Sequence, residues 1–187
     1  MRNIKSYLIT DPNYFSDNKE IFKEKLIAVL KNHKIDFACF RDKSSKNIEE
    51  LAKIFLQICK EFEIKNILIN SNISLAIKLG FDGVHLNSQQ FDKIENAKKS
   101  KLITIISCHN LEELDKAINK NIDFVTYSPI FDTPNKGQSK GVDKLNEVIE
   151  KFPNLKIFAL GGIIQNEQIK EIEKTKAYGF ASIRYFI

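Results

Sequence analysis

Short apolar runs alternate with amphipathic segments along the whole chain. Leu51, Phe55 and Ile58 recur at the spacing of one helical face, which predicts a helix with one buried side. Ile67-Leu-Ile69 is a continuous apolar run, typical of a parallel strand that is covered on both faces. The whole pattern predicts strands at 7–10, 37–41, 66–70, 83–86, 102–107, 124–128, 156–160 and 179–182, and helices at 17–32, 47–62, 74–79, 92–99, 111–119, 142–151 and 165–174.

This alternation predicts an α/β fold, with a (β/α)8 TIM barrel spanning residues 1–187 as one domain. A doubly wound open sheet is the alternative architecture. The chain ends five residues after the last predicted strand, so the eighth helix is expected to be missing or truncated. We expect an apolar flank near the first and last strands, and such a flank would suit a homodimer.

Composition narrows the class of partner. The chain is 43% hydrophobic and 28% charged, as in ordinary folded domains. Its net charge is +5, but the lysines alternate with glutamates along predicted helices, so we expect no nucleic-acid partner. No apolar run approaches the roughly 20 residues of a membrane span, and no signal-peptide pattern opens the chain, so a cytoplasmic location is expected. Cys39, Cys59 and Cys108 form no paired motif and are expected to be reduced core thiols.

Polar residues follow almost every predicted strand. In a barrel the carboxyl ends of the strands meet at one end, which is where function is expected. Singly, each of these residues has an ordinary structural explanation as an ion pair, a turn or a helix cap. Together they favour a site for a multiply charged anion. They are Arg41, Lys43, Asn70, His85, Ser107, His109, the loop from Ser128 to Gly137, Gly161, Gly162 and Arg184.

Two of these segments have the composition of phosphate-binding loops. Ser128-Pro-Ile-Phe-Asp-Thr-Pro-Asn-Lys136 offers backbone amides, two hydroxyls and an ammonium group. Ala159-Leu-Gly-Gly-Ile163 ends a strand and precedes a predicted helix. The sequence therefore predicts that the barrel handles phosphorylated small molecules.

These strand ends, in this order, resemble the thiamine phosphate synthase and thiazole tautomerase family over essentially the whole chain. Besides the two loops above, the similar segments are Tyr7-Leu-Ile-Thr-Asp11, Cys39-Phe-Arg-Asp-Lys43, Ile69-Asn70, Asp82-Gly-Val-His-Leu86 and Ser107-Cys-His109. In the synthase, a pyrimidine pyrophosphate loses its diphosphate with the help of magnesium, and a thiazole phosphate captures the resulting cation.

The resemblance implies roles for individual residues. Five would hold the diphosphate, namely Arg41, Lys43, Asn70, Ser107 and Lys136. Thr133 would hold the thiazole phosphate with the backbone of Gly161 and Gly162. Asn135 replaces a second loop threonine and can still donate a hydrogen bond, and Arg184 replaces a serine in the last phosphate loop. The implied partners are thiazole phosphate and hydroxymethylpyrimidine pyrophosphate.

The chain also departs from the family pattern. Ser71 and Gln90 stand where the family has two magnesium-binding aspartates, so no metal ligands are predicted, and magnesium is expected only if synthase activity is retained. Asp92 could replace one of them. Cys39 stands where a glutamine contacts the pyrimidine.

Three functions remain open. The first is a synthase. The second is a tautomerase-like enzyme; Pro129 occupies the position of that enzyme's catalytic histidine, so His109 or His85 would have to move the proton. The third is a thiazole-phosphate binder without activity. A different phosphate enzyme on the same barrel is a further alternative.

Overall fold

The computed structural model describes residues 4–187 and shows eight parallel strands closed into a barrel in the order β1 to β8. The first and last strands pair in register, Lys5 with Gly179 and Leu8 with Ser182, which closes the sheet. The predicted TIM barrel is therefore confirmed, and the open doubly wound sheet is wrong. The strands are β1 (Lys5–Ile9), β2 (Phe37–Phe40), β3 (Asn66–Asn70), β4 (Gly83–Leu86), β5 (Ile103–Cys108), β6 (Phe124–Tyr127), β7 (Ile157–Leu160) and β8 (Gly179–Ser182).

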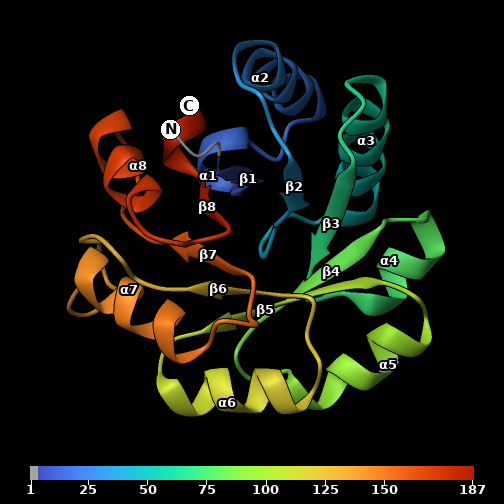
Figure 1. The fold of residues 1–187 in the computed structure, drawn as a ribbon. Helices are drawn as coiled ribbons and strands as arrows, with labels where there is room; N and C mark the ends of the chain where they lie inside the picture. Colours follow the sequence, from blue (N-terminus) through green and yellow to red (C-terminus); the bar gives the residue numbers. More distant parts are fainter. Residues whose placement is uncertain (1–3) are drawn as a thin grey trace.

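Helices surround the barrel on its outer side (Figure 1). The principal ones follow the predicted ranges to within about two residues. They are α2 (Lys19–Asn32), α3 (Ile48–Glu61), α4 (Ile73–Leu79), α5 (Ile94–Lys99), α6 (Leu111–Asn119), α7 (Gly141–Lys151) and α8 (Asn166–Glu173), with the short turns α1 (Pro12–Phe15), η1 (Phe91–Lys93) and η2 (Arg184–Phe186). Their apolar faces and the outer faces of the strands form the main core.

Aromatic rings fill the barrel at the amino ends of its strands. Phe37, Phe124, Phe158 and Tyr178 lie near the beginnings of different strands, with several ring centroids 5.2 Å apart. Tyr7 joins them at 5.2 Å from Phe158. The barrel is therefore packed at this end, and its polar residues lie nearer the carboxyl ends.

After β8 the described residues form the short turn η2, at the place where the barrel repeat would have a helix, as expected. The expected apolar flank is mostly covered from within. Phe186 is 2% exposed and packs against Phe180 of β8 and against His33 at the end of α2, with ring centroids 5.8 and 5.4 Å away. Ile187, at 60% exposed, is the apolar side chain that η2 leaves uncovered beside it.

Two further expectations concern the cysteines and membranes. Cys39, Cys59 and Cys108 are free and buried, as predicted. Burial raises the pKa of the Cys39 thiol to about 12, so this group stays protonated. Across residues 4–187, every helix is too short or too polar to span a bilayer.

Candidate functional site

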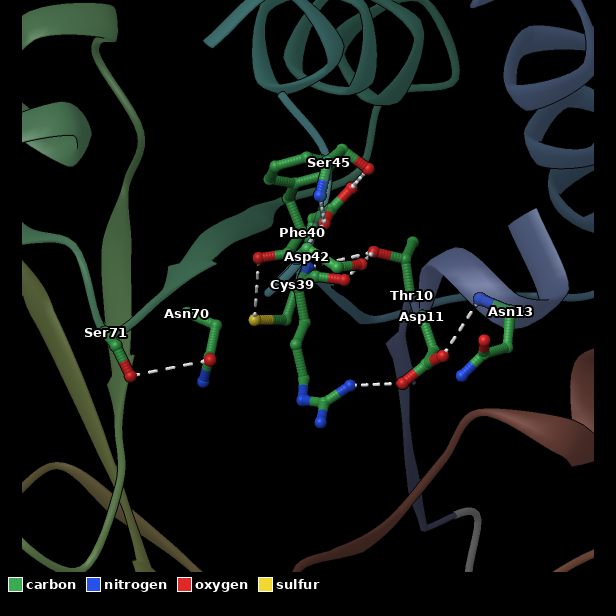
Figure 2. A network of polar contacts seen from close by, with 11 residues as sticks. Thr10, Asp11, Asn13, Cys39, Phe40, Asp42, Ser45, Asn70 and Ser71 are labelled. Carbon is green, nitrogen blue, oxygen red and sulfur yellow. Dashed lines mark hydrogen bonds and ion pairs between the residues drawn. The ribbon is translucent and has the colours of Figure 1, made fainter. Parts of the chain in front are cut away.

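The ends of β1 and β2 are joined by side chains at the carboxyl end of the barrel. The hydroxyl of Thr10 accepts from the backbone N–H of Arg41 at 2.9 Å and donates to its carbonyl at 3.3 Å. The guanidinium of Arg41 pairs with the carboxylate of Asp11, and the two side chains are only 26% and 15% exposed. Figure 2 shows Thr10 and Asp11 facing the residues that follow β2. Arg41 is therefore held in place before any ligand binds.

The loop after β2 is shaped by a different carboxylate. Asp42 accepts hydrogen bonds from the backbone N–H groups of Ser44 and Ser45, at 2.9 and 3.0 Å, and from the Ser45 hydroxyl at 2.6 Å. These contacts occupy Asp42 inside its own turn. Lys43 is exposed on that turn, and within residues 4–187 no carboxylate lies at ion-pair distance from it.

The ends of β3 and β4 carry a cluster of neutral side chains. Asn70 donates to the carbonyl of His85 at 3.0 Å, and Ser71 donates to Asn70 at 3.4 Å. The amide of Gln90 donates to the carbonyl of Ser71 at 3.2 Å, while its oxygen accepts from the backbone of Asn87 at 3.1 Å. Ser71 and Gln90 thus lie together, 19 residues apart in sequence, as expected of two positions that share one site.

This cluster tests whether the chain fits magnesium. Magnesium prefers carboxylate oxygens and near-octahedral geometry. Ser71, Asn87 and Gln90 instead provide amide and hydroxyl groups that already bind one another. In the described part of the chain, no three His, Cys, Asp or Glu side chains group as a metal site would need. The residues present therefore do not fit a magnesium ion.

A second polar network runs inside the barrel. The imidazole of His85 is 3% exposed and lies between the Tyr7 hydroxyl, 2.9 Å from Nδ1, and the Ser107 hydroxyl, 3.1 Å from Nε2. Burial, with a smaller contribution from the charge of Arg41, lowers the pKa of His85 to about 3. His85 is thus a neutral ring at physiological pH, which argues against its acting as a proton shuttle.

His109 begins the loop after β5 and is exposed. Its Nδ1 lies 3.2 Å from both the carbonyl and the hydroxyl of Ser128. Nδ1 can donate to the carbonyl or accept from the hydroxyl, so these contacts fix the ring in place with either nitrogen protonated. His109 therefore presents its other ring nitrogen, Nε2, at this end of the barrel.

The loops after β6 and β7 pack tightly together. The backbone N–H groups of Ile130 and Phe131 donate to the carbonyls of Leu160 and Gly161 at 2.9 and 3.0 Å. A Cβ on Gly162, where φ is 69°, would lie 2.6 Å from backbone atoms of Phe131. Glycine is required here because the backbone of one loop lies directly against the other. The two predicted phosphate loops are thus adjacent in space.

Within these loops the side chains of Thr133 and Lys136 differ in their freedom. The Thr133 hydroxyl donates to the carbonyl of Phe131 at 3.0 Å, so it would have to rotate to bind a ligand. Lys136 is exposed, and no carboxylate of residues 4–187 lies at ion-pair distance from it. Asn135 lies beside it with φ of 61°, an accessible conformation for asparagine.

Arg184 begins the turn η2 after β8 and is partly buried. The end of β8 is tied to the turn after β7 by Ser182, whose hydroxyl donates to the carbonyl of Ile163 at 2.7 Å and accepts from the backbone of Tyr185 at 3.1 Å. This places Arg184 on the same side of the barrel as Gly161 and Gly162.

The predicted site residues therefore lie at one end of the barrel. Arg41 and Lys43 follow β2, with Arg41 bound to Asp11, and most of the others fall in two regions. Direct contacts join Asn70, His85 and Ser107 across β3, β4 and β5. The glycine pair and the loop after β6 form the second region. Tyr7 and Thr126 belong to the network around His85 but are not predicted from the sequence, because each lies in an apolar run. A polar residue at an inward-facing position of a strand, where side chains alternate with period two, is the signal that could have identified them.

The closed barrel of eight parallel strands defines the class of protein, a TIM barrel. Its cationic and hydrogen-bonding side chains gather at the carboxyl ends of the strands, which is where TIM-barrel enzymes carry their active sites. The family model described as "Thiamine monophosphate synthase" matches residues 6–186. The chain belongs to the thiamine monophosphate synthase family.

Relatives and solved structures agree with this membership. A protein of Aquifex aeolicus with a provisional name as thiamine-phosphate synthase 2 is 36% identical over 186 residues, covering 97% of this chain and 96% of that protein. The thiamine-phosphate synthase of Pelagibacter ubique is 35% identical over 163 residues, covering 84% and 76%. The structure of a thiamine phosphate pyrophosphorylase from Pyrococcus furiosus superposes with a TM-score of 0.82 at 25% identity, covering 96% of this chain and 85% of the other.

Proposed function

We propose that the chain acts in thiamine biosynthesis, binding thiazole phosphate and hydroxymethylpyrimidine pyrophosphate at the carboxyl end of the barrel and joining them into thiamine phosphate. One observation supports this most strongly. The loop carrying Thr133 and Lys136 is packed by backbone contacts against Gly161 and Gly162, so two loops of phosphate-binding composition face one place.

The reaction requires one bond to break and one to form. The bond between the pyrimidine methylene and the diphosphate oxygen breaks, and the diphosphate leaves with the electron pair. The lone pair of the thiazole nitrogen then forms the new carbon–nitrogen bond. Negative charge grows on the leaving diphosphate, so fixed cations near it lower the barrier. Arg41, Lys43 and Lys136 are the cations that would do this, with hydrogen bonds from Asn70 and Ser107.

The thiazole phosphate would bind in the second region. The turn of Gly161 and Gly162 would offer backbone N–H groups to this phosphate. The loop after β6 packs against the side of the turn where Cβ atoms would lie. Thr133, Asn135 and Arg184 would add hydrogen bonds from the flanking turns. Lys136, in the same loop as Thr133, would contact this phosphate as well as the diphosphate. Arg184 can bind a phosphate through two N–H groups at once, which a serine hydroxyl cannot do.

A mass-spectrometric assay for thiamine phosphate tests this proposal. Purified protein is incubated with both substrates, with magnesium and with EDTA, beside an established synthase. Lys136→Ala should lower the rate, whereas Lys65→Ala should not, because Lys65 is exposed just before β3 at the opposite end of the barrel. Absence of product under both conditions, from protein shown to be folded, would contradict the synthase proposal.

The neutral cluster around Ser71 and Gln90 favours a second candidate, a thiazole-phosphate binder without synthase activity. Loss of a metal removes a contribution of several kcal/mol to transition-state stabilisation, while binding of a monophosphate can depend on Lys136 and the glycine turn alone. This candidate predicts calorimetric binding of thiazole phosphate that is equal in magnesium and in EDTA, with no product formed. Binding that needs magnesium would contradict it.

The tautomerase-like alternative depends on His109, whose ring is held by Ser128 through Nδ1. It predicts that His109→Gln abolishes isomerisation of a thiazole phosphate and leaves its affinity unchanged. A homodimer remains a prediction, and the covered position of Phe186 gives it less support than the sequence suggested.

A further inference from the structure

A chain of hydrogen bonds crosses the barrel below the predicted substrate site. It runs from the Tyr7 hydroxyl on β1 to Nδ1 of His85 on β4, at 2.9 Å, and from Nε2 of His85 to the Ser107 hydroxyl on β5, at 3.1 Å. The Thr126 hydroxyl on β6 lies 3.4 Å from the same Ser107 oxygen. Tyr7 and Thr126 are completely buried, His85 is 3% exposed, and Ser107 is partly exposed. The chain therefore leads from the interior to the mouth.

The direction of these hydrogen bonds follows from the partners of Tyr7. Burial raises the pKa of Tyr7 well above its usual value, so the phenol keeps its proton. Two groups among the described residues neighbour that hydroxyl, Nδ1 of His85 at 2.9 Å and the Cys39 thiol. An imidazole nitrogen is a much stronger acceptor than a thiol sulfur, so Tyr7 donates and Nδ1 accepts. The neutral ring then carries its proton on Nε2.

Nε2–H in turn sets the role of Ser107. It donates to the Ser107 oxygen at 3.1 Å, and the Thr126 hydroxyl donates to the same oxygen. The lone pairs of Ser107 are then occupied, while its own proton remains available towards the mouth. With the opposite tautomer, Nε2 would accept from the hydroxyl of Ser107, at 3.1 Å, or of Thr126, at 3.5 Å, and the Ser107 proton would no longer be reserved for a ligand.

We propose that Tyr7 and His85 are positioning residues that hold the Ser107 hydroxyl as a hydrogen-bond donor towards an anionic phosphate oxygen at the mouth of the barrel. The ligand class rests on the proposed function, whereas the direction of the hydrogen bonds rests on the geometry alone. A fixed donor suits an anion and disfavours a ligand that presents a donor of its own.

The tautomer can be measured directly in the ligand-free protein. Long-range ¹H–¹⁵N correlation spectra of the uniformly ¹⁵N-labelled chain show the ring nitrogens of its three histidines, and His85→Gln identifies the signals of His85. The expected result is a neutral ring protonated on Nε2 between pH 6 and pH 8. A ring protonated on Nδ1, or on both nitrogens, would overturn the inference.

Binding of inorganic pyrophosphate tests the consequence for Ser107. Tyr7→Phe keeps the ring and removes the donor, which frees Nε2 to accept from Ser107. We expect affinity to fall about 3- to 10-fold, the range for one neutral hydrogen bond. In a Ser107→Ala background the same substitution should change affinity less than about 2-fold. Equal losses in both backgrounds would mean that Tyr7 acts through general packing and would refute the positioning role.

Different results would contradict the ligand class and the direction of the hydrogen bonds. If the wild-type protein does not bind pyrophosphate but His85 is protonated on Nε2, the proposed ligand class is wrong and the hydrogen-bond direction is supported. If Tyr7→Phe does not fold, Thr126→Val provides the second variant, since it removes one donor to Ser107. The tautomer measured in the wild-type protein decides the inference in either case.

Discussion

The buried His85 ring should make the stability of this protein depend on pH in a characteristic way. In the unfolded chain the ring takes up a proton near pH 6.5, whereas burial lowers its native pKa to about 3. Between these values the unfolded state binds more protons than the native state. The stabilising contribution is therefore complete above pH 6.5 and is lost as pH falls from 6.5 towards 3.

The magnitude between pH 7 and pH 5 follows from the two pKa values. Over this range the unfolded state gains about 25-fold in statistical weight by binding the proton, which corresponds to about 2 kcal/mol of unfolding free energy. The native ring stays almost entirely neutral throughout, so it offsets very little of this loss. About 2 kcal/mol is a large fraction of the 5–15 kcal/mol typical of a folded domain.

Urea unfolding at pH 5, 6 and 7, followed by circular dichroism, measures this loss. His85→Gln is the matched comparison, because glutamine keeps a polar side chain that does not titrate in this range. The variant will be less stable at every pH, but its stability should fall by about 2 kcal/mol less than that of the wild type between pH 7 and pH 5. Parallel losses in the two proteins would refute the reasoning and would mean that the native ring is protonated near pH 6.

Three further substitutions test other parts of the structure. Gly162→Ala should cost at least about 2 kcal/mol more in urea unfolding than Gly137→Ala, because both glycines have positive φ but only the Cβ on Gly162 would meet backbone atoms, at 2.6 Å. Lys136→Ala should weaken thiazole-phosphate binding by about 1–3 kcal/mol in calorimetry, and an unchanged affinity would remove Lys136 from the site. Phe186→Ala should cost about 3 kcal/mol of unfolding free energy, whereas Ile187→Ala, at a side chain 60% exposed, should change it by less than about 0.5 kcal/mol.

Most of the barrel could be predicted from the sequence because its strands are short apolar runs separated by amphipathic helices. Five of the eight predicted strands differ from the observed ones by one or two residues at an end, which is the usual uncertainty at element ends. The turn α1 was missed. It has four residues, too few for a helical period, and depends on Pro12 at its first position and on Asp11 accepting from the backbone of Asn13.

The site was only partly predictable. Polar residues at strand ends stand out in sequence, so Arg41, Ser107 and the loop to Lys136 were found. Tyr7 and His85 are 78 residues apart, and their hydrogen bond arises only when β1 and β4 face one another across the barrel. No local pattern carries that information, because it depends on the closure of the sheet.

The central claim is that anions bind at the carboxyl end of the barrel, and the alternative is that they bind at the amino end. A hollow on the described surface lies there, lined by Lys98, Lys101 and Lys156 beside Phe124. Those lysines could attract an anion by charge alone, but that end is closed by aromatic rings and is opposite to the end where barrels carry their sites.

A crystal structure of the protein with thiazole phosphate and inorganic pyrophosphate would therefore be the most direct test. The account predicts a phosphate group between Lys136 and the turn of Gly161 and Gly162, and a diphosphate beside Arg41 and Ser107. Both anions at the amino end beside Lys101 and Lys156, with the carboxyl end empty, would contradict it.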